Sequence, residues 1–177
     1  MITMFPHRRA GGPGRLRMLA LGLALSVAVV DQASKAMARA HLETALDLTP
    51  FLALRLGFNP GVTFGLFAES GATGRWILSL VTGLIITWLL VWIWRMRRPS
   101  LAAAAGLVMG GASGNLMDRV RFGHVTDFID LHWGAAHWPT FNLADAAIVC
   151  GVGLLVWASR GGVETRDAFP AIGRAVR

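Results

Sequence analysis

The sequence predicts an all-α membrane protein built on four transmembrane helices. Its 177 residues are 54% hydrophobic and only 15% charged, with a mean hydropathy of +0.53, which is far more apolar than a soluble domain of this length. Four separate apolar segments are long enough to enter a bilayer. We expect a single membrane domain over residues 1–177, with its core at 16–158 and a polar cytoplasmic tail at 159–177.

The first apolar segment allows two interpretations. A basic stretch precedes an apolar run over residues 18–30, and small residues follow, as in a cleavable signal peptide. Asp31 and Lys35 favour a retained helix instead, because residues four apart share one helical face and can form an ion pair. We therefore expect a transmembrane helix over residues 16–38.

Three further segments follow in order. Residues 76–94 contain no charged residue and give the clearest transmembrane helix. Residues 101–117 are rich in Ala and Gly, as expected where helices approach closely in lipid, and residues 141–159 form a fourth apolar segment that carries Asp145 near its start. Eleven of the 17 Lys and Arg residues fall on the side that holds both termini, which predicts that both termini are cytoplasmic.

Two segments between the helices are expected on the outer side. Residues 46–59 alternate loosely in polarity between prolines and predict short strands at the membrane surface. Residues 121–140 are expected to form a loop, whose Trp133 and Trp138 favour the membrane–water boundary.

Composition excludes some classes of function. The net charge of +7 does not indicate nucleic-acid binding, because the arginines mark the ends of apolar segments instead of gathering on one face. Cys150 is the only cysteine, so an intrachain disulfide is impossible. Its apolar segment holds no His that could act as a base, so we expect Cys150 to be a small buried hydrophobic residue.

The predicted topology places a set of polar residues at one depth, near the outer interface. They are Asp31, Lys35, Asn115, Asp118, Arg119, Asp127, Asn142 and Asp145. Acids in such apolar surroundings indicate a functional site. Two close carboxylates would share one proton, so that one could activate water while the other protonates a leaving amine. Asp127 and Asp145 are the candidates, and this chemistry hydrolyses a peptide bond without metal or covalent intermediate.

Each polar residue also has a simpler structural interpretation. Asp145 could favour the positive end of a helix dipole, and Asn142 could be an N-cap. Asp118 could pair with its neighbour Arg119, and Asp130 could be a solvated or supporting residue. None of these roles explains why all of the residues share one depth.

A metal centre is the alternative at this site. His124, Asp127, Asp130 and His132 together offer two imidazoles and two carboxylates, which could hold zinc. Their spacing matches no metal-binding motif, and His132 and His137 could equally be interfacial residues beside tryptophans. We expect neither a metal nor another cofactor.

Five ordered blocks resemble lipoprotein signal peptidase (signal peptidase II), the bacterial membrane aspartyl protease family A8. They are Asp31-Gln32-Ala33-Ser34-Lys35, Asn59-Pro60-Gly61-Val62-Thr63-Phe64-Gly65, residues 110–119 (GGASGNLMDR), Val125-Thr126-Asp127-Phe128 and Phe141-Asn142-Leu143-Ala144-Asp145. The resemblance extends over about residues 16–158. It departs from the family pattern at Val62 and Thr63, where small residues are commonest.

The resemblance implies a fold and a set of site residues. It implies four transmembrane helices, an extracytoplasmic β-cradle that includes residues 46–59, and a short surface helix at 61–70. It implies Asp127 and Asp145 as the catalytic pair. The residues implied to contact substrate are Asn59, Asn115, Arg119 and Asn142, with Asp31 and Lys35 in support.

The resemblance also implies the substrate, a prolipoprotein whose cysteine carries diacylglycerol and which is cleaved just before that cysteine. The enzyme would lie in the bacterial cytoplasmic (inner) membrane, in contact with lipid and near its outer face, and would bind no nucleic acid. Three alternatives remain from the residues alone. They are a proton-coupled carrier that uses Asp31 or Asp145, a membrane scaffold and a metalloprotease.

Overall fold

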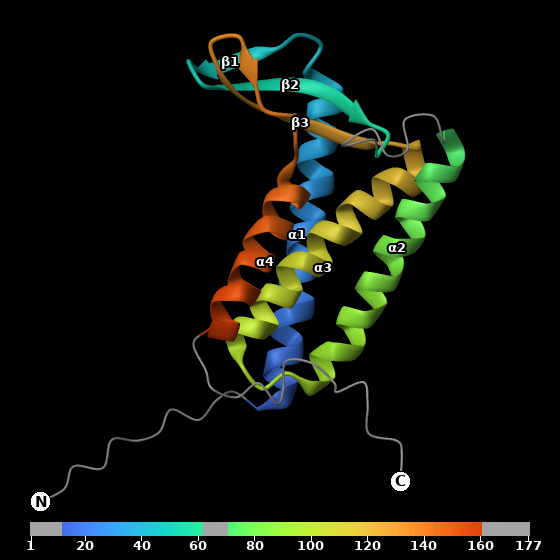
Figure 1. The fold of residues 1–177 in the computed structure, drawn as a ribbon, viewed down its shortest axis with the longest axis vertical. Helices are drawn as coiled ribbons and strands as arrows, with labels where there is room; N and C mark the ends of the chain where they lie inside the picture. Colours follow the sequence, from blue (N-terminus) through green and yellow to red (C-terminus); the bar gives the residue numbers. More distant parts are fainter. Residues whose placement is uncertain (1–11, 62–70, 161–177) are drawn as a thin grey trace, which may run out of the picture.

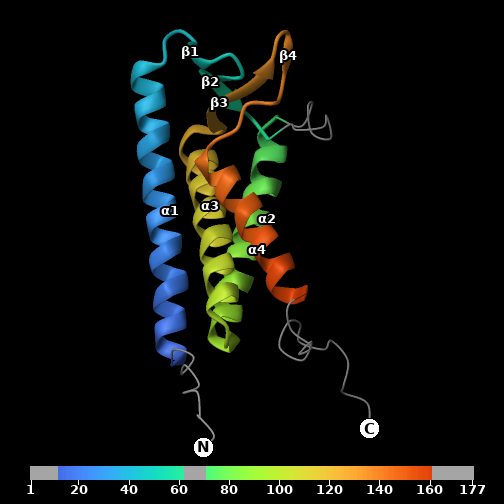
Figure 2. The ribbon, with the colours of Figure 1, turned by 90° about the vertical axis from the view of Figure 1, so that its left-hand side faces the viewer.

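The computed structural model describes residues 12–61 and 71–160. Four helices of membrane-spanning length and apolarity run side by side, and a small antiparallel sheet lies at one end of them (Figures 1 and 2). The helices are α1 (Pro13–His41), α2 (Gly71–Trp92), α3 (Pro99–Phe122) and α4 (Leu143–Arg160), and a 3-10 turn, η1 (Ile93–Arg95), continues α2. The four predicted helices are confirmed, and α1 extends three residues further at each end than expected.

Helix α3 forms the centre of the helical layer. In its apolar 18-residue stretch, 61% of the residues are buried, whereas the corresponding share in the other three helices is 17–22%. Glycines allow the close approach: a Cβ on Gly106 would lie 2.6 Å from the carbonyl oxygen of Ala20, and one on Gly110 would lie 2.6 Å from that of Ala24. The small residues expected to mark a close helix interface therefore do so.

The sheet contains four strands in the order β1-β2-β3-β4. Strands β1 (Leu46–Thr49) and β2 (Leu52–Asn59) confirm the strands predicted within 46–59. The loop expected over residues 121–140 is wrong, because this segment contains β3 (Val125–Trp133) and β4 (Ala136–His137). Residues 125–133 are mainly β-branched, aromatic or aliphatic, and β3 pairs antiparallel with β2.

Two further expectations concern individual segments. Cys150 is exposed instead of buried. It lies on the same outward face of α4 as the exposed Trp157, which follows it by about two helical turns. The surface helix expected at 61–70 lies outside the described residues, except for Gly61.

Gly123 sets the turn between α3 and β3. Its φ of 83° lies in the left-handed region, and its N–H donates a hydrogen bond to the carbonyl oxygen of Arg119 at 3.1 Å. Glycine at this position after a helix adopts the left-handed conformation without a Cβ clash. The turn directs the chain from the end of α3 into β3, which carries Asp127.

Candidate active site

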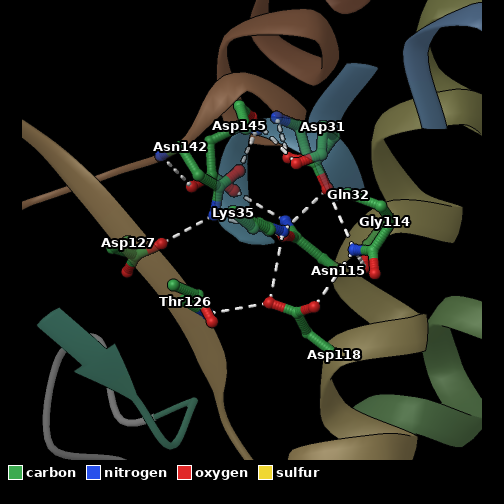
Figure 3. A network of polar contacts seen from close by, with 12 residues as sticks. Asp31, Gln32, Lys35, Gly114, Asn115, Asp118, Thr126, Asp127, Asn142 and Asp145 are labelled. Carbon is green, nitrogen blue, oxygen red and sulfur yellow. Dashed lines mark hydrogen bonds and ion pairs between the residues drawn. The ribbon is translucent and has the colours of Figure 1, made fainter. Parts of the chain in front are cut away.

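Buried polar side chains gather at the end of the helices that carries the sheet (Figure 3). They come from α1, α3, β3 and the start of α4, and they are Asp31, Lys35, Asn115, Asp118, Asp127, Asn142 and Asp145. All of them are at most 6% exposed except Asp145, which is half-buried. The structure thus brings together the residues that the sequence places at one depth.

Asn142 and Asp145 form a reciprocal cap at the start of α4. The backbone N–H of Asp145 donates to Oδ1 of Asn142 at 3.0 Å, and that of Asn142 donates to Oδ2 of Asp145 at 3.2 Å. A pair of this kind satisfies two amides that a helix N-terminus otherwise leaves without partners. The N-cap suggested for Asn142 is therefore present, and it holds both side chains in fixed positions.

Asp127 lies on β3, opposite Gly57 of β2, and is 2% exposed. The side-chain amide of Asn142 donates to its Oδ1 at 2.6 Å. Burial raises the pKa of the Asp127 carboxyl to about 6, and the nearby charge of Asp145 adds to this, although hydrogen bonds from Asn142 and Asn59 act in the opposite direction. Asp127 is therefore a carboxyl group that can hold a proton close to neutral pH.

Two asparagines connect the carboxylates of Asp127 and Asp145. The amide nitrogen of Asn115 donates to Oδ1 of Asp145 at 2.8 Å. Its own Oδ1 accepts from Lys35 Nζ at 2.8 Å and from Asn142 Nδ2 at 3.2 Å. Asn142 Nδ2 also donates to Asp127, so both acids belong to one hydrogen-bonded network. In this network the NH2 group of each asparagine side chain donates to an acid and its oxygen accepts an N–H, which fixes the orientation of both amides.

A buried ion cluster supports this network from α1 and α3. Lys35 Nζ lies 2.9 Å from Asp31 Oδ2 and 3.6 Å from Asp118 Oδ2, and the three side chains are fully buried. Asp31 Oδ1 accepts the backbone N–H of Ala144 at 3.0 Å, while Asp118 Oδ2 accepts that of Thr126 at 2.9 Å. Through these bonds the cluster fixes the start of α4 and the strand that carries Asp127.

The expected ion pair between Asp118 and Arg119 is wrong. Asp118 pairs instead with Lys35 and, at 3.9 Å, with Arg39. Successive residues on an α-helix point about 100° apart, so Asp118 faces α1 while Arg119 points elsewhere. The Nε of Arg119 is buried and has no hydrogen-bond partner among the residues that the structure describes.

Asn59, at the end of β2, lies close to Asp127. Its Oδ1 accepts the backbone N–H of Gly61 at 2.8 Å, and its side chain lies close enough to the Asp127 carboxyl group to lower the pKa of that group. Arg119 lies near enough to Asp127 and Asp145 to interact with both charges. Asn59 and Arg119 therefore border the two acids.

Sequence reasoning missed Gln32, Thr126 and Arg39 as parts of the site. Gln32 Nε2 donates to Asp118 Oδ1 at 3.0 Å and to the Gly114 carbonyl at 3.1 Å, and Arg39 donates to Thr126 Oγ1 at 2.7 Å. Arg39 was detectable, because it lies four residues after Lys35 on the same face of α1. The role of Thr126 depends on how β3 meets the helices, which local spacing does not reveal.

The metal-ligand set suggested by the sequence does not form as expected. Asp130 and His132 lie together, but His137 joins them in place of His124 and Asp127. The ring of His124 packs edge-on against Phe58, with centroids 4.6 Å apart. Asp130 is 1% exposed, so it is buried instead of solvated.

Comparison with known proteins identifies the family. The family model described as signal peptidase (SPase) II matches residues 23–160. The lipoprotein signal peptidase of Polynucleobacter necessarius is 39% identical over 84% of this chain and 90% of its own length. That of Burkholderia thailandensis is 44% identical over 77% of this chain and 84% of its own.

A solved structure gives the same result for the fold. A bacterial membrane enzyme determined by the in meso method at 2.3 Å resolution superposes with a TM-score of 0.70 and 26% identity, covering 89% of this chain and 94% of its own. With the matching family model and the similar curated sequences, this shows that the chain belongs to the signal peptidase II family, the bacterial membrane proteases that process lipoproteins.

Proposed function

We propose that this protein is an aspartic endopeptidase that removes the signal peptide from diacylglyceryl-modified prolipoproteins, cleaving just before the lipidated cysteine. Family membership already favours a protease over a carrier or a scaffold. The observation that carries the aspartic mechanism is the network in which Asn142 and Asn115 hold Asp127 and Asp145 in one site.

Asp127 carries the shared proton in this mechanism. Its pKa of about 6 lets it protonate the scissile carbonyl or the leaving amine. Asp145 is the base, because both of its oxygens accept N–H donors and the side chain is only half-buried, so it remains accessible to a water molecule. Water then attacks the carbonyl carbon while Asp145 takes its proton, and no covalent intermediate forms.

Asn59 and Arg119 contact the substrate in this proposal, together with Asn115 and Asn142. Asp31 and Lys35 do not touch it, and they hold Asn115 and the start of α4 in position. Arg119 suits the role because it lies near the charges of both acids and its Nε has no partner among the described residues.

We further propose that the sheet faces the outside and that both termini are cytoplasmic. Arg95 and Arg160 mark helix ends remote from the sheet, as the positive-inside rule requires of the cytoplasmic side (Figure 1). Residues 16–158 form the peptidase core of a single domain. A lipidated substrate then reaches the acids laterally, where acyl chains meet water.

The test is cleavage of a diacylglyceryl-modified prolipoprotein by purified protein in detergent. Asp127→Asn and Asp145→Asn should each reduce kcat/KM by about a hundredfold or more, because neither variant can share the proton. Asp47→Asn is the matched control, since Asp47 is exposed on β1 and should leave activity unchanged. A precursor without the diacylglyceryl group should be a poor substrate.

Two results would contradict the proposal. Normal cleavage by both folded dyad variants would show that the acids are not catalytic. Loss of wild-type activity on adding a chelator, restored by zinc, would favour a metalloprotease if both folded dyad variants also cleave normally.

A further inference from the structure

A second cluster of reactive side chains lies on the β3–β4 hairpin, separate from the proposed active site. It consists of Asp130, His132 and His137, whose ligand atoms all lie within 4.8 Å of one another. His132 and His137 are paired across the hairpin, and their rings stack with centroids 5.1 Å apart. Two imidazoles and one carboxylate form a ligand set that zinc commonly takes in proteins.

The spacing of the ligand atoms is close to what a metal ion requires. Ligands of tetrahedral zinc lie about 2.0–2.2 Å from the ion, and therefore about 3.4 Å from each other. His137 Nδ1 lies 2.9 and 3.0 Å from the two oxygens of Asp130. The three ligand atoms must therefore shift from separations of at most 4.8 Å to about 3.4 Å, and the partly exposed His137 has room to rotate.

His132 provides an independent indication of a ligand. Its Nδ1 is buried and has no hydrogen-bond partner within residues 12–61 and 71–160. Buried polar atoms nearly always have a partner, and an exception calls for an explanation such as an ion. The cluster therefore contains a buried imidazole nitrogen that the hydrogen bond between His137 and Asp130 leaves without a partner among the described residues.

Arg55 is the charged group that opposes a cation here. Its Nε lies 3.3 Å from Asp130 Oδ2, but its side chain is 53% exposed, so water and salt screen its charge. A carboxylate has lone pairs enough for two partners. Asp130 can therefore keep Arg55 on Oδ2 and offer Oδ1 to a metal.

We propose that Asp130, His132 and His137 bind one divalent transition-metal ion of the zinc class, with water as the fourth ligand. The ion ties β4 to the end of β3. It is separate from the proposed catalytic acids, because Asp127 and Asp145 are absent from its ligands.

The test is titration of zinc chloride into the full-length protein in detergent, tag-free and stripped of metal, by isothermal calorimetry at neutral pH. We expect one ion per chain. His137→Gln should weaken binding by more than about tenfold, since losing even an indirect partner of a zinc ligand costs about 10–100-fold. His124→Gln is the matched control, because its ring packs on Phe58 away from the cluster.

Thermal unfolding provides the second measurement. Zinc should raise the Tm of wild type and of His124→Gln, each relative to its own metal-free value, but not that of His137→Gln. Absence of binding by wild type, or an equal loss in His124→Gln and His137→Gln, would overturn the proposal. Because no substrate is present, these results do not depend on whether the proposed peptidase activity is correct.

Discussion

Replacing Lys35 with methionine should destabilise the folded protein strongly. Methionine fills a similar volume, so the change removes mainly a charge that contacts Asp31 at 2.9 Å, Asn115 at 2.8 Å and Asp118 at 3.6 Å. Removing one partner of a buried ion pair costs about 3–5 kcal/mol, because the other charge stays buried without compensation. Asp118 keeps Arg39, and Asp31 keeps the N–H of Ala144. We therefore expect the lower limit, about 3 kcal/mol.

The free energy of unfolding would be measured by titrating SDS into detergent micelles and following circular dichroism. Arg121→Met is the matched control, since Arg121 is exposed near the end of α3 and has no ion-pair partner in the described part of the chain. Arg121→Met should change the free energy of unfolding by no more than about 0.5 kcal/mol. A Lys35→Met variant as stable as this control would refute the buried ion cluster as a structural support.

A double variant separates the charge from the packing. In Lys35→Met combined with Asp31→Asn, no uncompensated carboxylate remains on α1. The loss of stability in the double variant should therefore be smaller than the sum of the two single losses by about 1 kcal/mol or more, a coupling typical of contacting residues. Additive losses would mean that Lys35 acts through packing and not through its charge.

Two further predictions use the same preparations. Gly106→Ala should cost about 1–3 kcal/mol because its Cβ would meet the Ala20 carbonyl at 2.6 Å. Gly83→Ala, where a Cβ meets nothing within 4 Å, should be neutral or stabilise by up to about 1 kcal/mol, and equal effects would contradict the close packing of α1 on α3. In the wild type, kcat/KM should fall as the pH rises through about 6, because Asp127 loses its proton. Because folding raises the pKa of Asp127, this carboxyl group contributes to the free energy of unfolding below pH 3.8, and the contribution is lost as the pH rises to about 6. Asp127→Asn should abolish this pH dependence of stability.

The helices could be predicted because the bilayer imposes a simple requirement on sequence. A span must be apolar over about 20 residues and must satisfy its own backbone hydrogen bonds, so residues 76–94 are identifiable without knowledge of any contact. The same requirement predicted that polar side chains would gather, since it placed Asp31, Asn115 and Asp145 at one depth on three different helices. Those three residues lie in one network in the structure.

Contacts that depend on non-local pairing were not predictable in this way. Residues 121–140 looked like a loop because β3 becomes a strand only by pairing with β2, which lies more than sixty residues earlier. The partner of Asp118 was also misassigned, since adjacency to Arg119 in sequence does not reveal that α1 supplies Lys35 and Arg39. Both errors concern partners that are distant in the chain.

Structural and functional interpretations of Asn142 and Asp145 do not exclude each other. Asp145 accepts the amide of Asn142, as a capping residue should, and this contact also holds its carboxylate at the end of the network that reaches Asp127. A helix N-terminus stabilises negative charge through its free amides and dipole. The start of α4 therefore gives a carboxylate in apolar surroundings a position where its charge is supported. The helix end itself supplies that support close to lipid, so the residue that completes the cap around Asn142 can also be the proposed base.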